Sequence, residues 1–268
     1  MSKRKEYSCV LVDTDAEGIT WITFNRPEKR NAMSPTLHVE MEEILYGLET
    51  DAETKVVVLT GAGNSWSAGM DLKQYFRETD NDPAARFRAA TAHRRWATEL
   101  LTWSRKPTIA MVNGVAVGGG FDLACACDLR TGSENSRFMV AFTRIGLFPG
   151  WGGTWLYSRI IGIPKAAEML FTGDFLEAKD AERFGLLNNL VPAAELEKET
   201  MNLARRIANG PPIAIRLAKM QLYKGLEMDL ETAMQVAAAC ETITLTSEDH
   251  KEGVAAFREK RPPQYKGK

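Results

Sequence analysis

Residues 108–125 of the 268-residue chain read TIAMVNGVAVGGGFDLAC, and the fold prediction starts from this stretch. Thr108–Val112 has the apolar, β-branched composition of a buried strand. Asn113–Gly120 follows as a glycine-bearing loop, and the apolar run Phe121–Cys125 predicts a helix. A strand, a loop and a helix are therefore expected in immediate succession.

The glycines of this loop leave backbone N–H groups uncovered. Gly118, Gly119 and Gly120 carry no side chains, and the start of the following helix adds partial positive charge. A second glycine-containing loop, Ser65–Leu72, follows another predicted strand. Two such loops are able to supply two N–H donors to one oxyanion. The alternative is that the glycines only let the helix pack closely on the sheet.

Short β-branched runs alternate with amphipathic segments through the first half of the chain. This pattern predicts an α/β fold, with helices around a core sheet. The expected helices are Pro35–Leu48, opened by a proline, and Ala84–Trp103. The other predicted strands are Val10–Val12, Ile19–Phe24 and Val56–Thr60.

Ala, Leu, Glu and Lys dominate the sequence after Thr154, so we predict a C-terminal third that is wholly helical. We divide the chain into a core, residues 1–200, and a helical region, residues 201–268. The apolar stripes of the last helices need a partner, either the core or another subunit, so oligomerisation is expected. The predicted helices are Pro192–Ala208, Ile213–Leu226 and Leu230–Leu245.

Composition argues against several classes of protein. The 34 basic and 35 acidic residues leave a formal net charge of -1, which gives no global attraction to nucleic acid or to an anionic membrane. No stretch approaches the ~18 uninterrupted apolar residues of a membrane span, and the N-terminal residues lack the apolar core of a signal peptide. We expect a soluble, cytoplasmic protein. Its cysteines, Cys9, Cys125, Cys127 and Cys240, are expected to be reduced thiols.

Several motifs resemble, in order and spacing, the crotonase superfamily of enoyl-CoA hydratases and isomerases. The first two are Asn25–Ala32 (NRPEKRNA) and Ala68–Leu72 (AGMDL), and the glycine loop ending in Gly118–Gly120 is the third. The resemblance covers nearly the whole chain. It continues through Lys106–Pro107, Asn113–Gly114, Gly146–Pro149, Gly152–Thr154, Leu170–Gly173, Ala181–Leu186, Glu252–Gly253 and Phe257–Pro262.

The resemblance implies a ββα spiral core with a C-terminal helical trimerisation region. It also implies that the backbone amides of Met70 and Gly119 form an oxyanion hole for a coenzyme A thioester. Lys29 and Lys260 would each place a cation beside a phosphate of the coenzyme. Taken alone, either lysine is more typical of a solvated surface charge. The implied coenzyme contacts are Lys29, Ala68 and Leu72, with Phe257 and Lys260 often supplied by a neighbouring subunit.

Within the family, residues 29–37 and 71–78 most resemble the hydroxycinnamoyl-CoA hydratase-lyases. This places Tyr75 near the acyl pocket, with a packing role equally open. An aromatic lining favours a bulky, aromatic or cyclic acyl group, although apolar loops at a trimer interface would look the same. The lining residues would be Trp66, Tyr75, Phe142, Phe148 and Trp151.

Hydration of an enoyl thioester needs a base for water and a proton donor for the α-carbon. The family's hydratases commonly carry glutamates at two positions, which are Asp122 and Phe142 here, and the hydratase-lyases carry their acid at the second. Other members of the family use an aspartate shortly after the Gly146–Pro149 motif. This chain has Gly150 and then Trp151 there, so that acid is missing. Asp122 is therefore the leading candidate acid. The alternative is that it only stabilises the helix dipole, which would lower its pKa where burial would raise it.

The remaining polar candidates are expected to be structural. Asp128 matches an aspartate with a structural role in the family, and His38, His93 and His250 are predicted to be surface residues. The spacing of the histidines offers no metal site.

We therefore expect a lyase that adds water to an unsaturated acyl-CoA through a stabilised enolate, with Asp122 as the base. Two alternatives stay open: a double-bond isomerase using the same acid, and a non-catalytic RNA-binding homologue, which the near-neutral charge disfavours. Coenzyme A is expected as part of the substrate, with no separate cofactor and no metal. The expected partner is a second or third copy of the chain, as a homotrimer or dimer of trimers, with no nucleic acid and no membrane.

Overall fold

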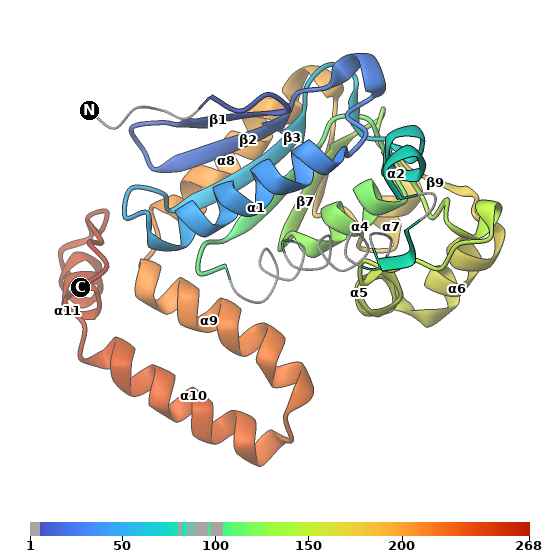
Figure 1. Cartoon of the computed structure of the whole chain (residues 1–268). Helices are drawn as coiled ribbons and strands as arrows, with labels where there is room; N and C mark the ends of the chain where they lie inside the picture. Colours follow the sequence, from blue (N-terminus) through green and yellow to red (C-terminus); the bar gives the residue numbers. More distant parts are fainter. Residues whose placement is uncertain (1–5, 80–81, 85–86, 88–95, 97–103) are drawn as a thin grey trace.

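Two β-sheets and the helices that cover them form the core of the protein (Figure 1). The structure, a computed structural model, describes residues 6–79, 82–84, 87, 96 and 104–268. The predicted helix Ala84–Trp103 lies almost entirely outside the described residues. None of the described helices is long and apolar enough to cross a membrane.

The larger sheet has six strands in the order β1-β2-β3-β5-β7-β10. β1 pairs antiparallel with β2, and the other neighbours are parallel. The four strands predicted from the sequence are confirmed, with ends that differ by at most two residues. The strands are β1 (Val10–Thr14), β2 (Ile19–Phe24), β3 (Val56–Gly61), β5 (Thr108–Val112), β7 (Leu129–Ser133) and β10 (Asn189–Val191).

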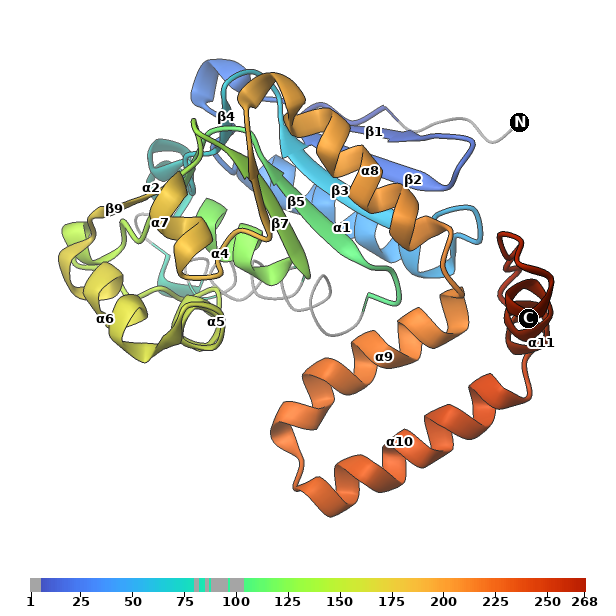
Figure 2. The ribbon, with the colours of Figure 1, turned by 180° about the vertical axis from the view of Figure 1, so that it is seen from behind.

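Helices cover both faces of this sheet, α1 (Pro35–Thr50) on one and α8 (Leu196–Ala208) on the other (Figures 1 and 2). β3 is buried along its whole length, and its alternate residues face opposite ways. Val57 and Leu59 belong to the core cluster that contains the inner face of α1. Val56 and Val58 belong to the second cluster, with Leu196, Ala204 and Ala208 of α8.

A smaller sheet has four strands in the order β4-β6-β8-β9. Each of its first three strands follows directly on a strand of the larger sheet, so β3 leads to β4, β5 to β6 and β7 to β8. Helices α2 and α4 follow β4 and β6, which gives the repeating ββα unit predicted from the resemblance. The bounds are β4 (Ser65–Ser67), β6 (Val115–Val117), β8 (Arg137–Met139), β9 (Phe175–Glu177), α2 (Leu72–Thr79) and α4 (Gly119–Ala126).

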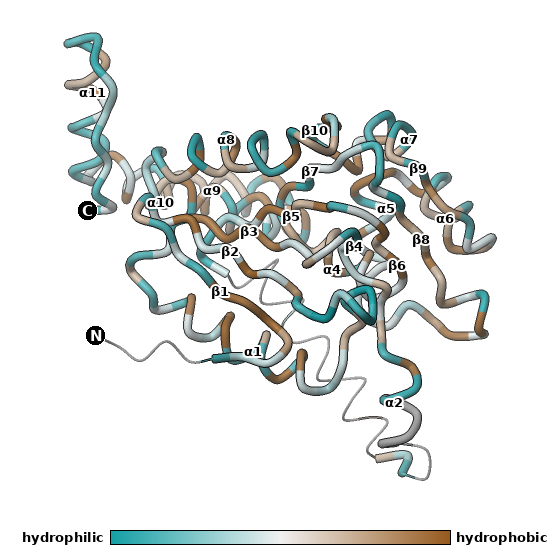
Figure 3. The backbone as a smooth tube through the Cα atoms, turned by 90° about the horizontal axis from the view of Figure 1, so that it is seen from above, coloured by the Kyte–Doolittle hydropathy of each residue, from teal (hydrophilic) through white to brown (hydrophobic). Residues whose placement is uncertain are grey.

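Further helices complete the chain. α5 (Gly153–Ile160), α6 (Gly162–Thr172) and α7 (Ala178–Arg183) pack beside α4 and the small sheet. α9 (Pro212–Lys224), α10 (Leu230–Leu245) and α11 (Glu248–Glu259) extend away from the core, and Figure 3 shows α11 projecting beyond it. Short 3-10 helices are η1 (Pro27–Lys29), η3 (Thr143–Ile145), η4 (Ala193–Glu195) and η5 (Gly225–Glu227).

The prediction of a wholly helical C-terminal third is wrong at β10. This strand has three residues and pairs in parallel with β7 at the edge of the sheet. Three residues are too few to display the alternation by which strands are recognised. The three predicted C-terminal helices are confirmed as α8, α9 and α10. The division at residue 200 falls inside α8 and stays a prediction.

Candidate active site

The loop after β3 is held in place by the motif that precedes α1. Asn31 is fully buried, with a left-handed backbone (φ 56°). Its side-chain amide donates to the carbonyl oxygens of Ala62 (2.9 Å) and Ser65 (2.8 Å), and its Oδ1 accepts from the Arg26 amide (2.9 Å). The Asn25–Ala32 motif therefore fixes the loop that leads from β3 into β4.

Met33, just after this motif, fixes the backbone on both sides of Met70. Gly69 accepts a hydrogen bond from the Met33 amide (2.7 Å), and the Asp71 amide donates to the Met33 carbonyl (3.0 Å). Arg26 completes the contact through an ion pair with Asp71 (3.0 Å). The backbone is thus paired on both sides of Met70, whose own N–H donates to no acceptor in the part of the chain that the structure describes.

Gly119 is the first residue of α4, so its N–H has no partner within the helix. Gly118 has a positive φ of 54°, and its amide donates to Met139 in β8 (2.9 Å). This turn leaves the Gly119 N–H at the positive end of the helix, without an acceptor among the described residues.

The loop that carries Met70 and the loop that precedes α4 come together at Gly69. A side chain on Gly69 would begin 2.6 Å from the Val117 carbonyl oxygen and 3.5 Å from the Gly119 nitrogen. Gly69 also has a φ of 85°, which favours glycine. The peptide that leads to Met70 therefore lies directly against the start of α4, and the two uncovered amides come from adjacent segments.

The glycines also allow close packing, as the alternative interpretation expects. A side chain on Gly120 would collide with the Ser67 carbonyl oxygen (2.6 Å) and one on Gly119 with the ring of Trp151 (2.5 Å). Close approach and exposure of backbone donors are thus properties of one triple-glycine turn.

Asp122 lies one helical turn after Gly119, on the same side of α4. Its carboxyl group is fully buried, and Tyr157 of α5 donates a hydrogen bond to its Oδ1. Burial raises the pKa of Asp122 to about 7, and the hydrogen bond from Tyr157 opposes that shift. A carboxyl group with such a pKa exists in both protonation states near neutral pH, as proton transfer requires.

Phe142 and Trp151 lie against the same turn. The ring of Phe142 would contact a side chain on Gly118 at 3.7 Å, and the ring of Trp151 lies on the side of Gly119 where a Cβ atom would project. Both aromatic residues are buried, with at most 9% of their surface exposed. The position at which many hydratases carry a second acid is therefore filled by an apolar ring.

His38 corrects a prediction, because it is buried rather than at the surface. It lies on the inner face of α1, and the indole N–H of Trp96 donates to its Nδ1 (3.0 Å). Its ring also meets that of Trp151, with centroids 5.3 Å apart. The hydrogen bond from Trp96 offsets the cost of burying Nδ1 of the imidazole. His250 is exposed as predicted, and His93 lies outside the described residues.

The predicted aromatic lining is wrong at Trp66. Its side chain is fully buried in the core, where the indole N–H donates to the Gly120 carbonyl (2.8 Å). This hydrogen bond helps to fix the backbone of the glycine turn. Phe148, in contrast, is 74% exposed.

The predicted coenzyme contacts fall into two groups. Ala68 and Leu72 flank Met70, and the Ala68 amide donates to Arg30 (2.9 Å), next to the exposed Lys29. Tyr75 is half-buried on α2. Ala68 and Leu72 therefore lie on the segment that carries the Met70 amide, and Lys29 precedes the residue that accepts from Ala68.

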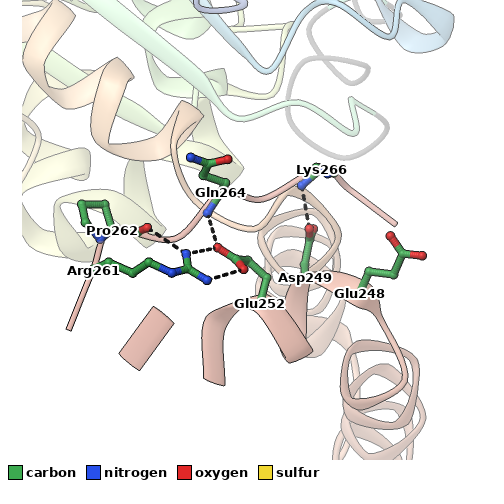
Figure 4. Close-up of a pocket in the computed structure, with 7 residues that line it drawn as sticks. All are labelled: Glu248, Asp249, Glu252, Arg261, Pro262, Gln264 and Lys266. Carbon is green, nitrogen blue, oxygen red and sulfur yellow. Dashed lines mark hydrogen bonds and ion pairs between the residues drawn. The ribbon is translucent and has the colours of Figure 1, made fainter. Parts of the chain in front are cut away.

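The second group, Phe257 and Lys260, is not brought to this site within one chain. Both residues are exposed at the end of α11, which Figures 1 and 2 place at the opposite end of the molecule from α2 and α4. The pocket of Figure 4 belongs to that distant region, between α11 and the C-terminal tail.

Asp128 has the structural role predicted for it. One carboxylate oxygen pairs with Lys219 (2.8 Å) and accepts from the Thr108 amide (2.7 Å), and the other accepts from the Tyr223 hydroxyl (2.8 Å). It ties α9 to the start of β5. Two other contacts, Tyr157 to Asp122 and Arg26 to Asp71, were not predicted, because their partners are 35 and 45 residues apart and carry no local pattern.

Together, the fold and this turn give an α/β protein in which the N–H groups of Met70 and Gly119 have no acceptor among the described residues and Asp122 is buried one helical turn from Gly119. Comparison with known proteins identifies the class of protein. The enoyl-CoA hydratase/isomerase family model matches residues 14–268. The chain belongs to this family, and with it to the crotonase superfamily.

Individual relatives agree. The chain is 34% identical over 257 residues to a short-chain-enoyl-CoA hydratase of Clostridium acetobutylicum, covering 96% of this chain and 97% of that protein. It is 41% identical over 216 residues to a hydroxycinnamoyl-CoA hydratase-lyase of Pseudomonas fluorescens, covering 80% and 78%. The crystal structure of an enoyl-CoA hydratase from Bacillus anthracis superposes with a TM-score of 0.92 at 35% identity, covering 97% and 100%.

Proposed function

We propose that this enzyme adds water to the double bond of an unsaturated acyl-CoA thioester, with Asp122 as the single acid–base group. The observation that carries the proposal is the fully buried Asp122 carboxyl group on the same turn as the Gly119 amide. The N–H groups of Met70 and Gly119 would bind the thioester oxygen, which becomes negative when water attacks.

The proton steps balance with one carboxyl group. The ionised Asp122 takes a proton from water as the oxygen of water bonds to the β-carbon, and the thioester becomes an enolate. The protonated Asp122 then returns that proton to the α-carbon, which regenerates the carboxylate and the neutral thioester. A pKa of about 7 suits both halves of this exchange.

The apolar Phe142 favours a second candidate reaction. Without a second acid to activate water, Asp122 alone is able to move a proton from one carbon of the acyl chain to another, which is double-bond isomerisation. Asp122 and the two amides have the same roles in both reactions, so the fate of water distinguishes them.

For the substrate, we propose an aromatic or cyclic acyl group. Phe142 and Trp151 flank the glycine turn, and Trp151 also packs against His38. The similarity to a hydroxycinnamoyl-CoA hydratase-lyase points the same way, although the acid position of that group of enzymes is Phe142 here. Lys29, Ala68, Leu72 and Tyr75 would contact the coenzyme and acyl portions, and Phe257 and Lys260 would come from a neighbouring subunit.

The experiment is turnover of crotonyl-CoA, cinnamoyl-CoA and cyclohexene-1-carbonyl-CoA in oxygen-18 water, followed by mass spectrometry. Hydration adds the label to the product. Isomerisation needs a proton on the γ-carbon, so it is open to crotonyl-CoA and cyclohexene-1-carbonyl-CoA but not to cinnamoyl-CoA, and it would give a separate chromatographic peak of unchanged mass. Asp122→Asn is expected to lower turnover at least about 100-fold, the scale of general acid–base catalysis, with coenzyme ester binding retained.

Asp128→Asn is the control, because this aspartate carries a structural contact only. Its pH–rate profile should keep the wild-type shape while its thermal midpoint falls. Unchanged turnover in Asp122→Asn would remove the assignment of Asp122.

A further inference from the structure

Asp122 is held by a second buried group from a different helix. Tyr157 is 1% exposed, and its hydroxyl donates to Oδ1 of Asp122. The Tyr157 ring stacks on Phe121, with centroids 4.6 Å apart and planes within 10°. The residue beside Asp122 therefore fixes the ring, and the ring fixes the direction of the hydroxyl.

Gly153 makes this contact fit. It lies one turn before Tyr157 in α5, and a side chain there would collide with Oδ1 of Asp122 and, at 2.7 Å, with the Tyr157 hydroxyl. The preceding Gly152 turns the chain into α5 with a φ of 92°. The backbone of α5 therefore lies directly against the carboxyl group.

The two carboxyl oxygens of Asp122 differ in environment. Oδ1 accepts the Tyr157 hydroxyl, whereas Oδ2 is buried and has no hydrogen-bond partner among the described residues. Burial and the neighbouring Asp122 raise the pKa of Tyr157 well above its usual value, so its hydroxyl stays protonated and acts as a donor. A proton that binds to Asp122 has only Oδ2 open to it.

We propose that Tyr157 is a positioning residue that occupies Oδ1 of Asp122 and so selects Oδ2 as the atom that gains and loses the proton, an inference that rests on the proposed acid–base role of Asp122. Tyr157 does not exchange a proton itself. It fixes the carboxyl plane and favours the ionised form through one hydrogen bond.

The first test is Tyr157→Phe, which removes one oxygen and keeps the ring stacked on Phe121. Loss of a hydrogen bond to the ionised carboxylate raises the pKa of Asp122. The acid limb of kcat/KM with cinnamoyl-CoA or crotonyl-CoA should therefore move to higher pH by about 1 unit, with kcat lowered and KM little changed.

The matched control is Tyr223→Phe. Tyr223 also donates its hydroxyl to an aspartate, Asp128 (2.8 Å), outside the candidate site. This variant should lose thermal stability and leave the acid limb in place. A shift of the same size in both variants would show a general structural effect and overturn the proposal.

A second variant keeps the proposal testable if Tyr157→Phe does not fold. Site-specific 3-fluorotyrosine at position 157 makes the phenol a stronger donor without removing it, so the acid limb should move to lower pH. An acid limb that stays in place with 3-fluorotyrosine overturns the proposal. If Asp122→Asn is inactive and Tyr157 substitution moves nothing, only the positioning role fails; if Asp122→Asn keeps its turnover, the proposed function itself fails.

Discussion

At the scale of single residues, burial decides the chemistry that Asp122 is able to perform. The folded protein raises the pKa of this group from 3.8 to about 7, because desolvation outweighs the hydrogen bond from Tyr157. The folded state therefore keeps a proton that the unfolded chain releases above about pH 4. The stabilising contribution of the proton is fully present below the unfolded pKa and is lost as the pH rises through 7.

This linkage predicts a pH-dependent difference between the wild-type protein and Asp122→Asn, whose side chain is neutral at every pH. Between pH 5 and pH 8, the free energy of unfolding of the wild-type protein should fall relative to the variant by about 2–3 kcal/mol. Urea unfolding at one fixed protein concentration measures both curves. Curves that stay parallel across this range would contradict the raised pKa.

At the scale of elements, the C-terminal tail stabilises the beginning of α11 (Figure 4). Asp249, which is buried, accepts hydrogen bonds from the amides of Lys266 (2.6 Å) and Gly267 (2.9 Å). The carbonyl of Lys268 accepts from the Glu248 amide (2.7 Å), which belongs to the first turn of α11. The tail thus satisfies helix N–H groups that would otherwise lack partners.

We predict that Asp249→Ala lowers the free energy of unfolding by about 2 kcal/mol, because two backbone donors lose a charged acceptor. Limited trypsin digestion should also release the tail faster, by cleavage after Arg258, Lys260 or Lys266. Asp174→Ala is the control, since Asp174 makes one exposed ion pair with Arg144 and should cost at most about 1 kcal/mol. Equal losses in the two variants would argue against the tail contact.

At the scale of the whole molecule, the C-terminal helices α9 and α10 have apolar surface that a single chain leaves exposed. No residue of α10 is buried, and Leu230 and Met234, on one face of it, are 79% and 62% exposed. Leu222 and Leu226 add further exposed apolar area near the end of α9. Patches of this kind mark interaction surfaces, in agreement with the expected association of subunits.

We predict that the wild-type protein sediments as an oligomer and that Leu230→Glu/Met234→Glu shifts it toward the 29.8 kDa monomer, because charges would have to be buried. Val39→Glu, at a 66% exposed position of α1, should keep the wild-type sedimentation coefficient. A wild-type protein that sediments as a monomer would contradict the prediction.

The motifs and the main elements could be predicted from sequence because their signals are local. The continuous β-branched run of β3 and the glycines that open α4 are readable over a few residues. The burial of His38 could not be predicted, because α1 is amphipathic and its inner face is known only when Trp96 and Trp151 are placed beside it. β10 was missed since three residues at a sheet edge carry no periodicity.

The sequence by itself determined the family motifs, which imply the ββα order, and it left Asp122 as the candidate acid. Only the tertiary structure decided that Tyr157 reaches this acid across 35 residues, that Trp66 belongs to the core, and that Phe257 and Lys260 are distant from the site within one chain. The physical reason is that pKa values and contacts depend on which side chains share a buried volume, and chain separation does not encode that sharing.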